Sequence, residues 1–162
     1  MTTKKVRCIG CGALVAEGDG PAHRYIGASP GCWALYGEVL AREYTDPRYG
    51  AAHQLTVDAY AAQHPGTPSP QAIQSVTVHL VGLYIVFELG RTPQQARKTI
   101  QRAVQHKKDF VWLDPPESLG AMTILDIHAA RAHSEHTTRV REWAMSVWRA
   151  WEPHHPMIRR WA

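Results

Sequence analysis

The sequence lacks an uninterrupted apolar run of the ~20 residues that a membrane span requires. Its longest apolar stretch, residues 76–89, is shorter and contains His79, Gly82 and Glu88. The basic residues at positions 4 and 5 are not followed by the apolar region of a signal peptide. We therefore expect a cytoplasmic protein without a membrane partner.

Cysteine is also scarce. The 162 residues include three cysteines, all within the first fifth of the chain. A secreted domain held by disulfides normally has an even number, so these cysteines indicate other chemistry. The length and the 44% hydrophobic content suit one domain with a sizeable core. The net charge of +4 permits an anionic partner without requiring one.

Helical patterns fill the chain after residue 31. Apolar residues recur at three-and-four spacing over residues 32–44, and further helices are predicted at about 51–63, 70–89, 93–106 and 123–151. The pairs Ser69-Pro70 and Thr92-Pro93 are typical of helix starts. The helix at 70–89 is apolar nearly all round, which predicts a central position. We expect an all-α fold, a bundle of about five helices over residues 32–162, preceded by a metal-binding segment over residues 1–31 within one compact domain.

The N-terminal segment is rich in glycine and contains Cys8-Ile-Gly-Cys11-Gly. A CxxC turn directs two thiolates at one point, and zinc takes such ligands at tetrahedral corners. Cys32 stands at the start of the first predicted helix, whose N-terminus would stabilise its thiolate. His23 is the nearest histidine and lies in the same loop. We therefore predict a zinc-knuckle-like segment in which Cys8, Cys11, His23 and Cys32 bind zinc.

Several alternatives to this ligand set stay open. The CxxC pair is also typical of redox sites, although no βαβ pattern surrounds it here. Cys32 alone is compatible with an ordinary buried thiol at a helix start. A histidine of the bundle, His53 or His136, is the main rival of His23 as the fourth ligand.

Histidines gather on two predicted helices. At 100° per residue, His53, Tyr60 and His64 share a narrow arc of the helix at 51–63. On the next helix, Ser75 and His79 share a strip of small or polar residues. If these faces pack together, they line an interhelical pocket for a small molecule or a protein partner. The predicted pocket residues are His53, Tyr60, His64, Ser75, His79 and His136.

Each of these histidines also has a plainer interpretation, as a core side chain that is hydrogen-bonded to the backbone or to a neighbour and fixes helix register. The first functional hypothesis is a zinc-stabilised binding module that uses the pocket. The second is a metal-dependent enzyme, a hydrolase or transferase. In the second hypothesis His53, His64 and His79 hold a catalytic metal, and Tyr60 or Asp58 assists proton transfer.

Positive charge accumulates along the predicted helix at 93–106 and just beyond it. Arg97, Lys98 and Arg102 lie on its outer face. A third hypothesis is therefore a nucleic-acid-associated protein that uses this helix. A solvated surface explains the same residues, and we favour that interpretation.

The motifs resemble those of a known family. The matching segments are Cys8-Ile-Gly-Cys11-Gly-Ala, Pro21-Ala-His23-Arg-Tyr25, Gly31-Cys32-Trp33-Ala-Leu-Tyr36, the block of residues 53–65 and Ser75-Val-Thr-Val-His79-Leu. They are similar to the DUF5946 family of bacterial proteins of uncharacterised function, which implies a shared fold and no established activity. The chain has a weaker resemblance to DinB-like helical bundles. Those proteins hold a metal with three histidines from separate helices. The spacing of His128, His133 and His136 does not fit that pattern cleanly.

Overall fold

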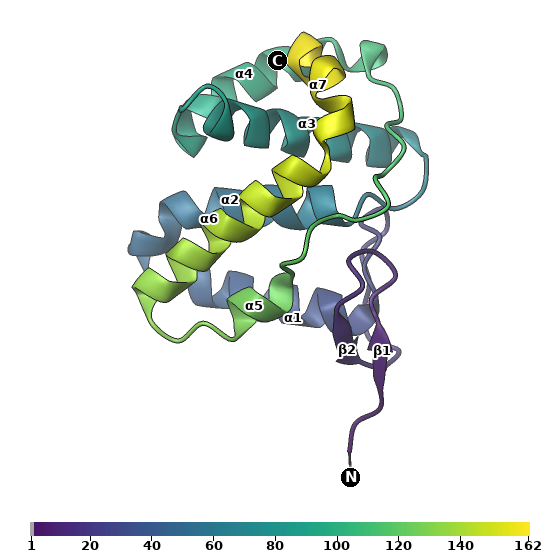
Figure 1. Ribbon diagram of the computed structural model, residues 1–162, viewed down its shortest axis with the longest axis vertical. Helices are drawn as coiled ribbons and strands as arrows, with labels where there is room; N and C mark the ends of the chain where they lie inside the picture. Colours follow the sequence, from purple (N-terminus) through teal and green to yellow (C-terminus); the bar gives the residue numbers. More distant parts are fainter. Residues whose placement is uncertain (1) are drawn as a thin grey trace.

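The computed structural model describes residues 2–162 and shows helices packed around one core, with a small β-hairpin at the N-terminal end (Figure 1). This confirms the predicted all-α fold class with a knuckle-like N-terminal segment. The described residues form α1 (Pro30–Tyr44), α2 (Gly50–Gln63), α3 (Pro70–Phe87), α4 (Pro93–Gln105), α5 (Ile124–His128), α6 (His133–Ala150) and α7 (His155–Trp161). Short 3₁₀ helices lie at η1 (Pro47–Tyr49), η2 (Lys107–Asp109) and η3 (Glu152–His154).

The first four helices begin and end within two residues of the predicted positions. Their start signals act as expected. The Ser69 hydroxyl accepts a hydrogen bond from the Ala72 amide at 3.0 Å. Thr92 and Gln95 form a reciprocal capping box at the start of α4. Local sequence therefore determines these boundaries.

The prediction of one long last helix over residues 123–151 is wrong, because the structure breaks it into α5 and α6. The break carries no glycine or proline and comes from a distant side chain. Nη1 of Arg42, on α1, donates to the carbonyl oxygens of Ile127 and Ala130 at 3.1 and 3.2 Å. Its Nη2 donates to the carbonyl of His128 at 3.0 Å. These bonds satisfy carbonyl groups that a continuous helix would have bonded internally.

α2 lies in the middle of the molecule and packs against α3, above it in Figure 1, and against α6, which crosses in front of it. Its C-terminal end is firmly anchored. Nε1 of the buried Trp151 donates to the carbonyl of Ala62 at 3.0 Å, and Nε1 of Trp143 donates to Oε1 of Gln63 at 3.1 Å. The Gln63 amide in turn donates to two carbonyl groups of the segment before α5. The residue that follows, His64, therefore has a fixed position.

α3 occupies the central position that its apolar sequence predicts, in contact with α2, α4, α6 and α7. Within the described residues it is the helix that is long and apolar enough to cross a membrane by length and composition, with 18 residues of mean hydropathy 1.3. Half of it is buried inside the bundle. The core helix of a packed protein satisfies the same criterion, so the observation is weak evidence for a membrane span.

Candidate metal centre

The CxxC motif forms the turn of the N-terminal hairpin. Strands β1 (Lys5–Arg7) and β2 (Leu14–Ala16) pair in antiparallel register, with Val6 opposite Val15. The Gly12 amide donates to the carbonyl of Cys8 at 3.0 Å, and Gly12 adopts a φ of +75°. That left-handed conformation favours glycine. The turn places Cys8 and Cys11 at its inner side. The two strands, of three residues each, were not predicted from the sequence.

Cys32 lies in the first turn of α1 and is fully buried. The residue that caps this helix, Ser29, uses its side chain on the hairpin instead of on its own helix. Its hydroxyl accepts from the Ile9 amide at 2.9 Å, and its own amide donates to Sγ of Cys8 at 3.4 Å. The helix start and the CxxC turn are therefore held in contact.

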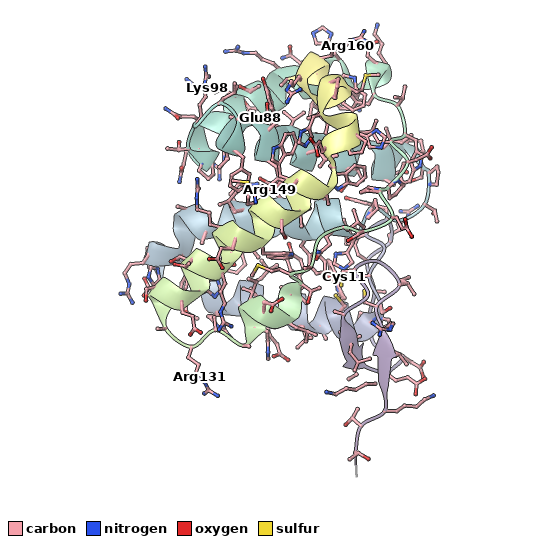
Figure 2. All side chains as sticks on the ribbon, viewed as in Figure 1. Cys11, Glu88, Lys98, Arg131, Arg149 and Arg160 are labelled. Atoms are coloured by element: carbon pink, nitrogen blue, oxygen red, sulfur yellow. The ribbon has the colours of Figure 1, made fainter. Side chains whose placement is uncertain are left out.

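His64 is the residue that ends α2, and it brings the fourth side chain to the same point. The potential ligand atoms of Cys8, Cys11, Cys32 and His64 all lie within 4.8 Å of one another. Sγ of Cys11 is 3.9 Å from Sγ of Cys32, and Nε2 of His64 is 3.4 Å from the same sulfur. Figure 2 shows Cys11 where the hairpin meets the helices. This group can hold a metal ion.

Two of the separations match those around a tetrahedral ion. Ligands at ordinary zinc distances are separated by about 3.8 Å for two sulfurs and about 3.5 Å for a sulfur and a nitrogen. The Cys11–Cys32 and Cys32–His64 separations of 3.9 and 3.4 Å are close to those values. The donor set, three thiols and one imidazole, suits a soft or borderline divalent ion.

The orientation of the His64 ring follows from its other nitrogen. Nδ1 lies 2.7 Å from the backbone carbonyl of Tyr60, which can only accept a hydrogen bond. Nδ1 therefore carries the proton, and the lone pair of Nε2 points toward the cysteines. Metal-binding histidines are commonly fixed by a bond of this kind.

A second group of contacts surrounds the sulfurs. The Tyr60 hydroxyl donates to Sγ of Cys32 at 3.4 Å. The Tyr60 ring stacks on Tyr36 with centroids 3.8 Å apart. Burial raises the pKa of Tyr60, so its hydroxyl stays protonated as a donor. Such donors stabilise thiolate charge.

The four groups strongly perturb one another in the absence of an ion. Hydrogen bonds from Cys11 and Cys32 lower the pKa of the Cys8 thiol. Hydrogen bonds to Cys11 and Cys8 raise the pKa of the Cys32 thiol, and burial adds to the effect. Burial opposes charge on His64, yet hydrogen bonds to Cys11 and Cys8 raise its pKa to about 9. The cluster thus favours the thiolate form of Cys8 and the protonated form of Cys32, and a bound cation would favour thiolate on its cysteine ligands.

Glycines let three loops close around His64. A Cβ on Gly10 would lie 2.3 Å from the carbonyl oxygen of Gly27 and 2.5 Å from Cδ2 of His64. A Cβ on Gly27 would lie 2.7 Å from Cα of Gly66. Gly10, inside the CxxC turn, therefore makes room for the His64 ring.

His23, our predicted fourth ligand, does not join the group. Its Nδ1 accepts hydrogen bonds from the backbone amides of Tyr25 and Ile26 at 3.3 and 3.2 Å, which shape its own loop. Its ring packs against Tyr25 and Trp33. Sequence proximity favoured His23, whereas the fold brings in His64 from 32 residues beyond Cys32. The sequence feature that could have identified His64 as the fourth ligand is its position at the end of a predicted helix, directly before Pro65.

The six residues of the predicted pocket do not converge, because they belong to separate groups. Tyr60 and His64 are part of the metal centre. His53 and His136 both bond to the buried carboxylate of Glu43, a residue that the sequence analysis missed. Nδ1 of His53 is 3.2 Å from Oε2, and Nε2 of His136 is 3.4 Å from Oε1.

The remaining two residues of that pocket lie on α3. Nδ1 of His79 is 2.8 Å from Oδ1 of Asp58, which is buried on α2, and Ser75 is half-buried. A Cβ on Gly82 would lie 2.8 Å from Oδ2 of Asp58, so this glycine admits the carboxylate between the two helices. His53, His64 and His79 therefore do not form the catalytic metal site of the second hypothesis. The contacts of His53, His79 and His136 match the plainer interpretation as hydrogen-bonded core residues.

The basic residues of α4 lie at the surface. Arg97, Lys98 and Arg102 are exposed, and Figure 2 shows Lys98 at the outer edge of the bundle. The third hypothesis, binding of nucleic acid by this face, stays a prediction.

A family model described as "Family of unknown function (DUF5946)" matches residues 6–152. The chain belongs to the DUF5946 family. The matched range contains all four residues of the metal centre, from Cys8 to His64. No curated protein and no solved structure matches the chain.

The weaker likeness to DinB-like bundles gains no support. His128 pairs with Glu38 at 2.6 Å, and His136 bonds to Glu43. His133 packs against the ring of Tyr49. His136 packs against the same Tyr49 ring. Within the described residues, these three histidines are not part of a group that could hold a metal ion, and the DUF5946 resemblance is the one that the structure and the comparisons support.

Proposed function

We propose that this DUF5946 protein binds one zinc ion through Cys8, Cys11, Cys32 and His64, and that the ion fastens the N-terminal hairpin to the helical bundle. The domain that the ion stabilises in this way acts as a binding module for a small molecule or a protein. The observation that carries the proposal is the approach of four ligand atoms, from the hairpin, the start of α1 and the end of α2, to within 4.8 Å.

The donor set supports zinc over other biological metals. Calcium and magnesium take oxygen ligands, and none of the four side chains supplies one. Iron–sulfur clusters are commonly held by four cysteines, and the chain has three. Three thiolates with one imidazole at tetrahedral spacing are a common structural zinc site.

The closed coordination supports a structural ion. Catalytic zinc keeps one position for water or substrate, whereas structural zinc has four protein ligands. Here four side chains are in place, and Cys8, Cys32 and His64 are at most 3% exposed. This arrangement favours a binding module over a hydrolase or transferase that works at this ion.

The short hairpin supports a stabilising role for the ion. An isolated two-stranded hairpin is marginally stable in water, and each strand here has three residues. Structural zinc contributes about 10–16 kcal/mol of binding free energy in zinc-finger peptides. One ion that joins the hairpin to α1 and α2 would therefore hold the segment in place.

The test is elemental analysis of protein purified without chelator. We expect one zinc per chain. Cys8→Ser, Cys32→Ser and His64→Ala should each lose zinc to a chelator concentration that leaves the wild type loaded. His23→Ala is the matched control and should keep its zinc. Protein without metal, or a His64→Ala variant that keeps zinc as firmly as His23→Ala, would overturn the proposal.

A further inference from the structure

A groove lies at the end of α2 opposite to the metal centre. It has a volume of about 350 Å³ and runs between the start of α2, the turn from α3 to α4, and α6. In Figure 1 the start of α2 and the α3–α4 turn lie on the same side of the molecule, away from the hairpin. The groove shares no residue with the metal centre, so its function is argued independently of zinc.

The charged residues that line the groove are Arg48, Arg91 and Arg141, and no carboxylate lines it. Arg48 is held by Asp46, with Nη2 2.7 Å from Oδ2. Within residues 2–162, the side chains of Arg91 and Arg141 have no hydrogen-bond or ion-pair partner. The groove therefore has an excess of positive charge. Guanidinium groups bind phosphate and carboxylate oxygens through paired, charge-assisted hydrogen bonds.

The position of Arg141 is restrained without using its hydrogen-bond donors. Its Cζ lies over the ring of Phe87 at 5.2 Å from the centroid. This cation–π contact leaves the N–H groups available. A restrained, unneutralised guanidinium loses little conformational entropy when it binds an anion.

Apolar residues form the floor. Ala52, Leu55 and Val86 line the groove and are at most 6% exposed as whole residues. Neither α2 nor α4 has an acidic residue in its first turn, so the partial positive charge of these helix ends adds to the charge of the arginines. The groove is thus apolar at its base and cationic at its rim. Its volume is at the lower end of the range for small-molecule pockets.

We propose that this groove binds a phosphate monoester that carries a short apolar group. The phosphate is bound by Arg91 and Arg141, with Arg48 adding charge, and the apolar group lies on Leu55 and Val86. A free ester and the headgroup of an anionic lipid share this chemistry. The experiment therefore presents the phosphate in both forms.

The probe for the free ester is hexyl phosphate, titrated by calorimetry into the full, zinc-loaded chain, with hexanol and inorganic phosphate as comparisons. We expect hexyl phosphate to bind more tightly than either, and its binding to weaken as salt is added. Arg91→Ala and Arg141→Ala should each weaken binding about 10-fold or more, as for loss of a charged hydrogen bond. Arg97→Ala removes the same charge from the outer face of α4 and should leave the affinity unchanged.

The probe for the lipid is a vesicle of phosphatidylcholine with phosphatidic acid, compared with phosphatidylcholine alone. Binding to these vesicles that depends on Arg91 and Arg141, without binding of hexyl phosphate, assigns the phosphate to a lipid. Binding of hexyl phosphate with the same dependence assigns it to a free ester. The proposal is overturned if neither probe binds, or if Arg91→Ala and Arg141→Ala bind as well as Arg97→Ala.

Discussion

His64 donates from Nδ1 to the carbonyl of Tyr60 at 2.7 Å and directs Nε2 at Sγ of Cys32, 3.4 Å away. The last turn of α2 therefore sets both the position and the tautomer of the one nitrogen in the metal centre. The bundle and the N-terminal hairpin meet at this side chain.

The first prediction concerns the space around the His64 ring. Gly10→Ala would place a Cβ 2.3 Å from the Gly27 carbonyl oxygen and 2.5 Å from His64 Cδ2. The backbone carbonyl cannot move aside cheaply, so we expect about 1–3 kcal/mol of destabilisation and weaker zinc binding. Chemical unfolding and chelator competition measure the two effects. Gly18→Ala, where nothing lies within 4 Å of the added Cβ, should behave as wild type. Equal behaviour of the two variants would contradict the described packing.

The second prediction concerns the tyrosine hydroxyl that bonds to Cys32. Tyr60→Phe removes the donor at 3.4 Å and keeps the ring that stacks on Tyr36. Loss of such an outer contact typically weakens metal binding about 10–100-fold. Competition with a chromophoric chelator gives the affinity. Tyr36→Phe is the matched control, because its ring belongs to the same stack and its hydroxyl does not bond to sulfur. An unchanged zinc affinity in Tyr60→Phe would show that the hydroxyl has no role at the metal.

The third prediction concerns Arg42, which bonds to three carbonyl groups at the break between α5 and α6. Arg42→Met keeps much of the apolar stem and removes the side-chain donor to the carbonyls of His128 and Ala130, whereas the Ile127 carbonyl still accepts from the Ala130 amide. We expect about 2–3 kcal/mol of destabilisation in urea unfolding, as for buried groups that lose charged hydrogen bonds. Arg131 lies in the same turn and is exposed (Figure 2), so Arg131→Ala should change the free energy of unfolding little. If the two variants lose the same stability, Arg42 does not hold the break.

The fourth prediction is a pH dependence at the C-terminal helix. Hydrogen bonds from Arg159, at 2.8 and 2.9 Å, hold the pKa of Glu88 below its usual 4.5. Because this pKa is lowered in the folded state, the stabilisation is present above about pH 4.5 and is lost as the pH falls through the lowered value. The pair is partly exposed, so solvent screening keeps its contribution small.

The measurement is the free energy of unfolding of wild type and Glu88→Gln from pH 7 to pH 3. The wild type should be the more stable at pH 7, and the difference should shrink as the pH falls below about 4.5. Loss of zinc in acid affects both proteins alike and cancels in the difference. A gap that stays constant over this range would rule out the ion pair as its source.

The parts of the fold that follow local rules could be predicted from the sequence. Ser69-Pro70 and Thr92-Pro93 begin α3 and α4 at the expected residues, because a capping hydroxyl and a proline act within one turn. The break between α5 and α6 could not be predicted, since its cause is Arg42, 85 residues before Ile127. α7 was also missed, because Pro153 ends the preceding pattern and the seven residues of this helix are too few to show a helical period.

The metal centre shows the same division. The CxxC turn and the helix-start position of Cys32 are local features, and both contribute to the cluster. The choice between His23 and His64 depends on where α2 ends relative to the hairpin, which is a property of the packed bundle. The prediction of one shared pocket was wrong for a similar reason. The buried carboxylate of Glu43 bonds to His53 and His136, and that of Asp58 bonds to His79. No helical pattern identified those carboxylates as partners.

X-ray absorption spectroscopy at the zinc edge, on protein purified without chelator, tests the central claim most directly. The account predicts a four-coordinate ion with three sulfur ligands at about 2.3 Å and one nitrogen at about 2.0 Å. The spectrum should be the same in His23→Ala and should lose the nitrogen in His64→Ala. A first shell made mainly of oxygen and nitrogen, or a spectrum that changes in His23→Ala and not in His64→Ala, would contradict it.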